Sequence, residues 1–538
     1  MRKATGVTIV GWGFATLLLG GCPPAVPDLC SGAECGLPGG ELVVEVEGNP
    51  SRKFRQGYGA EPTNVAAVVH VTGPNLDGVT AVTVGTAPNA VNGMVVANTP
   101  TKLTFKLSIP HGAPLGSQPL NVMAAAGPLT VANAVTITAI TAAPAGNDGN
   151  DLGAASTGTD ERPVRSLAKA TSIAGAGDTI FLKDGTYDMA HGETFAPVTS
   201  APVKVTPNIP ANVTIKGESV ANTKIVGPGS KLTDVYGLVA AGDVRIESLD
   251  ISGFDVGVYV VNADAAVKDV SVHACATGID VENASTTHTH KFTLDAANVY
   301  ENDVTGVISN GAAAFVTNCH VHHNATFGID SSGRPISVTS TEIDHIGGPA
   351  GSSHAAIISP AGAMLTNVNV HDNRWYGYVG YDAPSNDTPL VITGSIFANN
   401  DVRGISLAGR GSWSVKVRES RFIVNKREDY PNSQAIYLGI DLKMFDLGTP
   451  DSQGNNQFTL CSTCYGIVDN RVAPPGSPPP PFPLHVSGNK WFLGSAVSTP
   501  TAGCSNAKSP SAGPPHHWDI TNPGTCSTSG NNGNFILN

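Results

Sequence analysis

Charged side chains are scarce in this chain of 538 residues, because Asp, Glu, Lys and Arg together make up 14% of it, against about 25% in an ordinary soluble domain. Long surface helices need a charged face, so this composition argues against a mainly helical protein. Aromatic residues reach only 6%, so smaller apolar side chains must fill the core. Basic residues number 31 against 43 acidic ones. The resulting net charge of -12 argues against nucleic acid as a partner.

Turn-forming residues are abundant instead. The chain has 61 glycines and 39 prolines, and 41% of its residues are hydrophobic. That apolar content is enough for a folded core, which excludes disorder as the main state. Together these features favour many short strands and turns, divided over two or three domains.

The first 22 residues have the pattern of an export signal. A positive start, Met1-Arg2-Lys3, precedes an apolar run that ends at Leu19, and the downstream chain has no second apolar run long enough to span a membrane. The string LLLGGC resembles a bacterial lipobox. This resemblance implies lipidation of Cys22 and attachment to the bacterial outer membrane through that lipid alone. The alternative is an ordinary signal peptide that is cut elsewhere.

Eight cysteines remain after Cys22, in an export compartment where disulfides are the default expectation. Short spacing suggests three pairs, which are Cys30–Cys35 in a tether over 23–40, Cys461–Cys464, and Cys504–Cys526 in a tail over 496–538. Zinc is the alternative ligand for these cysteines, but no second C-x-x-C follows at the spacing of a zinc ribbon.

Residues 41–142 show short alternating strands separated by turn signals, which predicts a small β-sandwich. The run VVHVTGPNLDGVTAVTVG, with its turn at Gly73-Pro74-Asn75-Leu76, resembles the immunoglobulin-like IPT/TIG family. That resemblance implies a spacer or interaction module, and no cluster of acids, histidines or nucleophiles here indicates catalysis. A linker over 143–162 follows.

The next segment, VRSLAKATSIAGAGDTIFLKDGTYD, resembles the opening of pectate-lyase-like proteins. Those proteins form a right-handed parallel β-helix, which the resemblance places at residues 163–495. The fold class expected is therefore all-β, a small immunoglobulin-like sandwich followed by a right-handed parallel β-helix. A short helix at this point would cap the open end of the first coil.

An internal repeat supports the same fold independently of the resemblance. A short sequence motif that contains a glycine recurs along this segment. Its glycine is found at 257, 278, 306, 328, 377 and 404, in steps of 21, 28, 22, 49 and 27 residues. Steps of this size suit one coil each, and the step of 49 is two coils, with Ala355 or Ala356 in place of one glycine. In each coil, the alignment predicts one inward residue directly before the turn, which we call the anchor. The anchors are Ile251, Val272, Tyr300, Val321, Ile343, Val370, Phe397 and Phe422.

Period-two alternation also predicts inward residues two positions earlier, at Leu249, Val270, Asn298, Cys319, Thr341, Val368, Ser395 and Ser420. Three positions after the anchor, Asn324, Asn373, Asn400 and Asn425 resemble the asparagine ladder of β-helix turns. Generic turn asparagines are the alternative. Cys275 takes a ladder position and Cys319 an inward position two coils later, which is too far for a disulfide. Both are predicted to be buried free thiols.

Outward positions beside the anchors form a strip of imidazoles and carboxylates, in which we expect His273, Glu301, His322, Asp344 and His371, flanked by His320, Glu342 and Asn369. Coils lie about 4.8 Å apart, so these side chains should be neighbours. Such a strip can bind sugar hydroxyls, hold a metal or transfer protons. The alternative is a solvated sheet face.

The segment HDNRWYGYVGYD adds aromatic side chains that suit sugar rings, or that cover the end of the core. Trp375 and Tyr381 therefore join the strip as ligand-binding candidates. The catalytic candidates are His322, Asp344 and His371, with Arg374 or Arg421 to neutralise a uronate. The motifs of polygalacturonases and alginate epimerases are absent.

These features give one leading hypothesis and two alternatives. The leading hypothesis is a lipid-anchored cell-surface protein that binds an extended polysaccharide. One alternative is a polysaccharide lyase or epimerase that acts on an acidic glycan, and the other is a structural surface protein. No cofactor is required by these patterns, and calcium is a candidate ligand.

Overall fold

The computed structural model describes residues 41–460 apart from 61–65, 150–156, 194, 196–207, 230–233, 285–287, 349–353, 382–387, 425–432 and 450, and beyond 460 only short strands. Predictions for the lipidation site, the three disulfides and one ladder asparagine lie outside the described residues, at Cys22, Cys30, Cys35, Cys461, Cys464, Cys504, Cys526 and Asn425. None of the helices in the described part reaches the length and apolarity that crossing a membrane requires.

The first domain is a small β-sandwich, as its alternating pattern predicts. Its strands pair in the order β1-β3-β6-β5-β4-β7-β8-β2 around a core that includes Phe54, Val69 and Phe105, all with no exposed surface. The strand bounds are β1 (Val43–Val46), β2 (Lys53–Arg55), β3 (Ala67–Thr72), β4 (Ala81–Val84), β5 (Val91–Thr99), β6 (Lys102–Leu107), β7 (Gly116–Ala124) and β8 (Gly127–Thr138).

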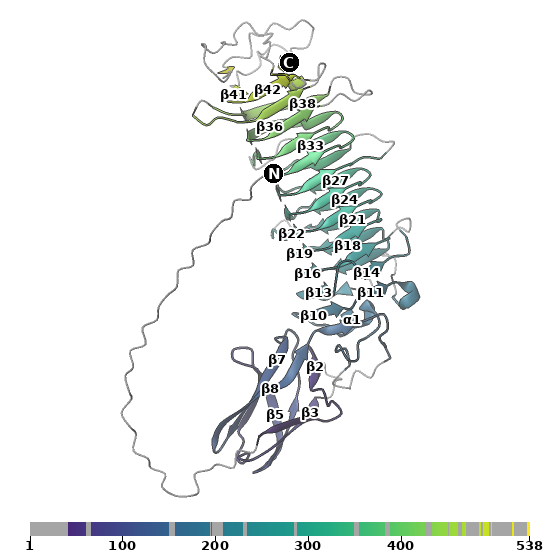
Figure 1. The fold of residues 1–538 in the computed structure, drawn as a ribbon, viewed down its shortest axis with the longest axis vertical. Helices are drawn as coiled ribbons and strands as arrows, with labels where there is room; N and C mark the ends of the chain where they lie inside the picture. Colours follow the sequence, from purple (N-terminus) through teal and green to yellow (C-terminus); the bar gives the residue numbers. More distant parts are fainter. Residues whose placement is uncertain are drawn as a thin grey trace, which may run out of the picture.

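The second domain is a right-handed parallel β-helix whose coils stack away from the sandwich (Figure 1). Each coil contributes one strand to each of three parallel sheets. The first sheet contains β10 (Thr179–Leu182), β13 (Val213–Gly217), β16 (Val244–Glu247), β19 (Ala265–Lys268), β22 (Lys291–Asp295), β25 (Ala313–Thr317), β28 (Ile336–Thr339), β31 (Ala363–Thr366), β34 (Leu390–Thr393), the ends of β36 (Arg403–Arg418) and β38 (Gln434–Asp446), and β41 (Leu484–His485).

The other two sheets differ in strand length. The short-strand sheet contains β11 (Gly185–Tyr187), β14 (Thr223–Val226), β17 (Asp250–Ser252), β20 (Ser271–His273), β23 (Asn298–Tyr300), β26 (His320–His322), β29 (Glu342–Asp344), β32 (Asn369–His371), β35 (Ile396–Ala398), β37 (Arg421–Val424), β39 (Gln457–Leu460), β42 (Lys490–Leu493) and β43 (Ala496–Val497). The long-strand sheet contains β12 (Asn208–Ile209), β15 (Tyr236–Ala240), β18 (Val256–Val261), β21 (Thr277–Glu282), β24 (Thr305–Asn310), β27 (Phe327–Ser332), β30 (Ala355–Ile358), β33 (Tyr376–Tyr381), the beginnings of β36 and β38, and β40 (Tyr465–Asp469). Two late strands, β44 (Asp519–Ile520) and β45 (Phe535–Leu537), pair antiparallel to β41 and β40.

The recurring glycine that revealed the repeat has a packing reason in the long-strand sheet. A Cβ atom built on Gly278 would lie 2.5 Å from the carbonyl oxygen of Gly306 in the next coil. The equivalent position opposite Gly328 is Ala356, which settles the choice between the two alanines. The glycine therefore marks a close approach of successive coils.

The inward columns confirm the predicted register in seven of the eight aligned coils. Their anchors are buried, for example Val272, Val321 and Val370 with no exposed surface. The exception is the coil of β23, where Val299 pairs with Val272 and Val321 and is the inward residue. Tyr300 and Asn298 point outward there, so both inward assignments were wrong. The misalignment arises because an aromatic residue satisfies the same apolar pattern as the valine before it.

The asparagine ladder is confirmed for the residues that the structure describes. The Nδ2 atom of Asn324 donates to the carbonyl of Val299 at 3.0 Å, and that of Asn373 donates to Asn400 Oδ1 at 2.8 Å. Asn302, missed because of the shifted register, also belongs to it and donates to Asn324 Oδ1 at 2.8 Å. Each amide therefore ties its coil to a neighbouring one.

Cys275 and Cys319 are buried free cysteines, as predicted. The backbone N–H of Cys275 donates to Asn302 Oδ1 at 3.1 Å, which confirms its ladder position. Burial raises the pKa of the Cys275 thiol to about 12 and that of Cys319 to about 11. Both thiols are thereby kept neutral and unreactive.

The sandwich lies at the end of the β-helix where the first coils begin (Figure 1). Between them, His111 Nδ1 lies 2.6 Å from Asp178 Oδ2 in a partly buried contact. Strand β9 (Ile140–Ala142) follows the sandwich directly and pairs parallel with β10. The helix α1 (Leu167–Ile173) begins after Ser166, whose hydroxyl accepts from the N–H of Lys169, and it buries Leu167. A 3-10 helix, η1 (Met189–His191), follows β11. The short helix expected at the start of the β-helix is therefore present.

Candidate functional site

The outward side of the short-strand sheet carries two polar rows, one on either side of the inward column. The parallel register brings together Asp250, Ser271, Asn298, His320, Glu342 and Asn369 in one row, and Ser252, His273, Tyr300, His322, Asp344 and His371 in the other. We call these two rows the polar strip. Six of the nine predicted ligand-binding residues lie in it, namely His273, His320, His322, Glu342, Asp344 and His371.

Asp344 is the centre of the polar strip. Its Oδ2 atom lies 2.7 Å from His320 Nε2, and its Oδ1 atom lies 2.5 Å from His345 Nδ1. The residue is only 6% exposed. Burial alone would raise the pKa of Asp344, but the hydrogen bonds from His320 and His345 outweigh it and lower the pKa. The carboxylate is therefore ionised at neutral pH.

His371 and His322 flank this carboxylate. His371 Nε2 lies 2.9 Å from Glu342 Oε1 and 4.0 Å from Asp344 Oδ2. Burial lowers the pKa of His371, but hydrogen bonds to Glu342 and Asp372 raise it above its ordinary value. For His322, burial and the neighbouring His320 lower the pKa. The two imidazoles on either side of Asp344 in its row therefore favour different charge states.

Three rings of the second row stack face to face. The ring centroids of His273 and Tyr300 are 4.7 Å apart, and those of Tyr300 and His322 are 5.0 Å apart. His322 Nε2 also lies 3.1 Å from Asn298 Oδ1. The polar groups of the strip thus already satisfy one another, which leaves few of them free for sugar hydroxyls.

Four predicted site residues lie outside the polar strip. Glu301 is not in the outward row, because Tyr300 takes that position, and it lies in a left-handed turn with φ 52°. Trp375 precedes the long-strand sheet and packs edge-on against His354. Tyr381 ends β33 in that sheet, and Arg374 lies beside Gly347 in the turn before it. The predicted aromatic platform and arginine are therefore not part of the strip.

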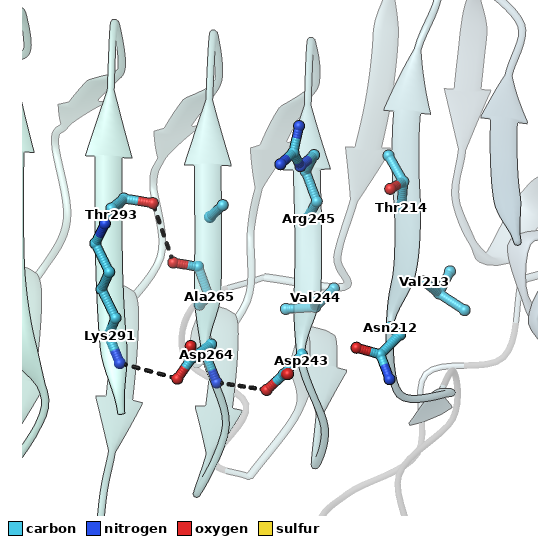
Figure 2. Close-up of a pocket in the computed structure, with 11 residues that line it drawn as sticks. Asn212, Val213, Thr214, Asp243, Val244, Arg245, Asp264, Ala265, Lys291 and Thr293 are labelled. Carbon is cyan, nitrogen blue, oxygen red and sulfur yellow. Dashed lines mark hydrogen bonds between the residues drawn. The ribbon is translucent and has the colours of Figure 1, made fainter. Parts of the chain in front are cut away.

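A hollow of about 720 Å³ lies beside the first row of the strip. Asp269, Asn298, His320 and Glu342 contribute to its walls. A second, smaller hollow of about 400 Å³ lies on the first sheet, where Arg245 and Lys291 come from separate strands (Figure 2). There Asp264 Oδ1 accepts from the backbone N–H of Lys291 at 3.0 Å. This second hollow is lined by groups that stabilise turns.

The outward side of the long-strand sheet holds two carboxyl groups that the sequence analysis missed. Asp280 in β21 and Asp330 in β27 share a register row, with Ile308 of β24 between them. Their neighbours along each strand are buried inward residues, so both carboxyl groups point away from the core. Two coils separate them by about 10 Å.

Asp280 has the larger pKa shift of the two carboxyl groups in this row. Burial raises its pKa to about 7, and the charges of Glu282 and Asp330 act in the same direction. Its Oδ1 atom is buried without a hydrogen-bond partner among the described residues. Burial also raises the pKa of Asp330. A carboxyl group with a pKa near 7 can both donate and accept a proton at neutral pH.

Tyrosines lie beside this row in the two coils before Asp280. Tyr259 donates its hydroxyl to Glu282 Oε2 at 2.7 Å and packs edge-on against Tyr236. Burial raises the pKa of Tyr236 to about 12, and the charge of Asp255 adds to this. Glu282 thereby places a second carboxylate two residues along β21 from Asp280, on the same side of the sheet.

Arg403 lies further along the same face, five coils from Asp280. Its guanidinium lies 3.6 Å from the ring centroid of Tyr437 and 5.5 Å from that of Tyr376. The Nε atom donates to Gln434 Oε1 at 2.9 Å. An apolar patch of Ala355, Ile358 and Val379, separate from the main core, lies between the carboxyl groups and this arginine. We call this band, from Tyr236 to Tyr437, the long-strand face.

Part of the chain matches one family model and one curated protein. Residues 147–375 match a family model described as "Protein of unknown function (DUF1565)". YwoF of Bacillus subtilis (strain 168) is 32% identical over 150 residues, which are 26% of this chain and 30% of YwoF. The chain thus spans less than a third of that relative's length.

Solved structures share the architecture at low sequence identity. Pectate lyase Pel9A is 13% identical with a TM-score of 0.37, and the match covers 68% of this chain and 82% of that one. The A-module of the mannuronan C-5 epimerase AlgE6 of Azotobacter vinelandii is 12% identical with a TM-score of 0.43, covering 61% and 89%. These likenesses concern the fold alone. The chain is a parallel β-helix protein with an N-terminal β-sandwich, and the helix contains the segment that resembles the DUF1565 family.

Proposed function

We propose that this protein binds an extended polysaccharide along its long-strand face and that Asp280 transfers a proton to or from the bound sugar. The observation that carries the proposal is the half-buried, outward-facing Asp280 carboxyl, whose Oδ1 atom is buried without a hydrogen-bond partner among the described residues. Burial raises its pKa to about 7, which agrees with this role. A buried acid of this kind costs stability, and structure alone gives no reason to keep it.

The rest of the face suits an extended glycan. Tyr236, Tyr259, Tyr376 and Tyr437 offer rings for the apolar faces of sugars. Arg403 supplies a positive charge that favours an acidic chain. These groups recur coil by coil along a straight band, so an extended polymer can contact several of them at once.

A panel of acidic and neutral polysaccharides tests the proposal. We expect wild-type protein to be retarded in gels that contain an acidic polysaccharide and to produce new reducing ends, unsaturated uronates or epimerised residues. Asp280→Asn should still be retarded but should lose turnover by about 100-fold or more. The matched control is Asp295→Asn, a carboxylate on the first sheet that pairs with Lys268.

The outcomes separate the alternatives. Retardation without turnover in the wild type would support binding alone, the leading function expected from the sequence, and would remove the catalytic role of Asp280. Neither retardation nor turnover with any glycan of the panel would contradict both roles and leave a structural surface protein.

We also propose that the protein is exported and anchored to the bacterial outer membrane through a lipid on Cys22, in line with the lipobox pattern. Cys22→Ala should move the protein from the membrane fraction to the soluble fraction without unfolding it, because this residue lies outside both domains. Fractionation with and without the signal peptidase inhibitor globomycin measures this. An unlipidated mature N-terminus in the wild type, found by mass spectrometry, would contradict the anchor.

A further inference from the structure

We propose that the Asp344 cluster of the polar strip binds one divalent transition-metal ion, with His320, His322 and Asp344 as its ligands. This inference goes beyond the proposed function, because the strip lies on the short-strand sheet rather than on the face assigned to the glycan. The bound ion would be a cation of intermediate softness, such as Zn²⁺, Cu²⁺ or Ni²⁺.

The geometry brings three ligand atoms together. One atom each of His320, His322 and Asp344 lies within 4.8 Å of the other two. Two of these residues alternate along β26, and the third is paired opposite His322 in β29. All three therefore point to the same side of one sheet, and the backbone register fixes their spacing before any ion arrives.

Both His320 and His322 must adjust to hold an ion. His322 Nε2 lies 3.1 Å from Asn298 Oδ1, so its Nδ1 is the ligand atom, and the ion would replace the contact of this Nδ1 with His323 Nδ1 at 2.9 Å. Tetrahedral Zn²⁺ with bonds of about 2.0–2.1 Å keeps its ligand atoms about 3.3 Å apart. His320 Nε2 and Asp344 Oδ2 are 2.7 Å apart, a distance set by a shared proton. The side chain of His320 is 42% exposed, so it can move back by this small amount and leave an open position toward solvent.

The crowding of imidazoles is the second, independent observation. Five of the 15 histidines of the chain lie in three successive coils around Asp344, at positions 320, 322, 323, 345 and 371. The ring centroids of His320 and His322 are 4.1 Å apart, and those of His323 and His345 are 4.6 Å apart. Several imidazole nitrogens are therefore concentrated around one carboxylate, as a transition-metal site needs.

The donor set selects the class of ion. Two imidazole nitrogens and one carboxylate suit Zn²⁺, Cu²⁺ and Ni²⁺, while Ca²⁺ and Mg²⁺ take oxygen ligands. The ligands are also oriented from behind. Asn298 Oδ1 accepts from His322 Nε2 at 3.1 Å, and His345 Nδ1 holds the second oxygen of Asp344 at 2.5 Å. Such supporting contacts fix ring orientation in known metal sites.

Two titrations of the full-length protein, first treated with a chelator, test the proposal. Calorimetry measures the binding of Zn²⁺, and visible absorption measures the binding of Co²⁺. We expect binding of one ion per chain. His320→Gln and His322→Gln should each weaken the affinity by about 100-fold. His273→Gln is the matched control, since it lies in the same row two coils away and stacks on Tyr300, and its affinity should equal that of the wild type.

Each other outcome overturns the assignment. Absence of binding by the wild type, or equal binding by His322→Gln, would contradict the site. A second set, Glu342, Asp344 and His371, also lies within 4.8 Å, so loss of binding in His371→Gln but not in His322→Gln would place the ion there instead. Circular dichroism verifies the fold of each variant. Zn²⁺ binding by Asp280→Asn should be unchanged, which separates this test from that of the proposed function.

Discussion

The Nδ1 atom of His111 in the sandwich lies 2.6 Å from the Oδ2 atom of Asp178, which immediately precedes the first strand of the β-helix. Asp178 has no exposed surface. Its other oxygen accepts from the backbone N–H of Gly112 at 2.8 Å, and Oδ2 also accepts from that of Gly175 at 2.9 Å. One buried carboxylate thus joins both domains.

Replacement of this carboxylate should be costly. We expect Asp178→Ala to lower the free energy of unfolding by about 2–4 kcal/mol, because three donors lose their acceptor in a buried place. Urea denaturation followed by circular dichroism measures this. Asp160→Ala, which removes an exposed carboxylate paired with Lys53, should change the value by less than about 0.5 kcal/mol. Equal effects of the two substitutions would show that the contact does not stabilise the protein.

The asparagine ladder makes a second stability prediction. Asn324 is fully buried, donates to Val299 and accepts from the N–H of Asn302. Asn324→Ala should lower the free energy of unfolding by about 2–3 kcal/mol, since both backbone groups are left unpaired. Asn310→Ala, at an exposed position of β24, is the control. A loss below about 0.5 kcal/mol in Asn324→Ala would contradict a stabilising ladder.

The register of the coils was largely predictable from the sequence. In a parallel, in-register stack, residues at the same position of the repeat become neighbours in successive coils. That is why His320, His322, Asp344 and His371 were expected together and do lie together. The shift at Tyr300 arose in a coil lengthened by the insertion around 283–290, where two adjacent apolar residues both fit the pattern. Asn302, three positions after Val299, carried the signal that would have corrected it.

The long-strand face could not be predicted in the same way. Asp280 follows Gly278-Ile279 and Asp330 follows Gly328-Ile329, so alternation places both outward. Their raised pKa values depend on burial by surrounding structure, which a repeat alignment does not contain. The one signal for the row in the sequence is that an Asp follows Gly-Ile at both positions.

Asp280 should make stability depend on pH in a specific direction. Its folded-state pKa of about 7 lies above the value of about 3.9 expected for an unfolded chain. The native state therefore holds a proton that the unfolded state releases, and stability falls as the pH rises from about 4 to 7. Between pH 4 and 7, the free energy of unfolding of the wild type should fall by up to about 4 kcal/mol relative to that of Asp280→Asn.

Urea denaturation of both proteins at a series of pH values provides the measurement. Burial raises the pKa of Glu193 to about 7 as well. That residue is present in both proteins, so the difference between them isolates Asp280. A difference that stays constant between pH 4 and 7 would contradict the raised pKa of Asp280.

The two buried thiols predict a chemical result. Cys275 and Cys319 should resist alkylation by iodoacetamide in the native protein at pH 8, because their thiols are buried and their pKa values lie near 12 and 11. Both should be alkylated once the protein is unfolded without a reductant, which peptide mapping by mass spectrometry detects. A peptide that links the two would contradict the coil assignment.

Strand β9 has a consequence for how this protein behaves at high concentration. A stack of parallel coils is a short filament whose bare end can template the next molecule. Here the first sheet begins with a strand that arrives directly from the sandwich, and α1 packs beside it. Among the described residues, β9 occupies the edge of β10 that a second molecule would join, so the sandwich hinders growth of a filament through the first sheet.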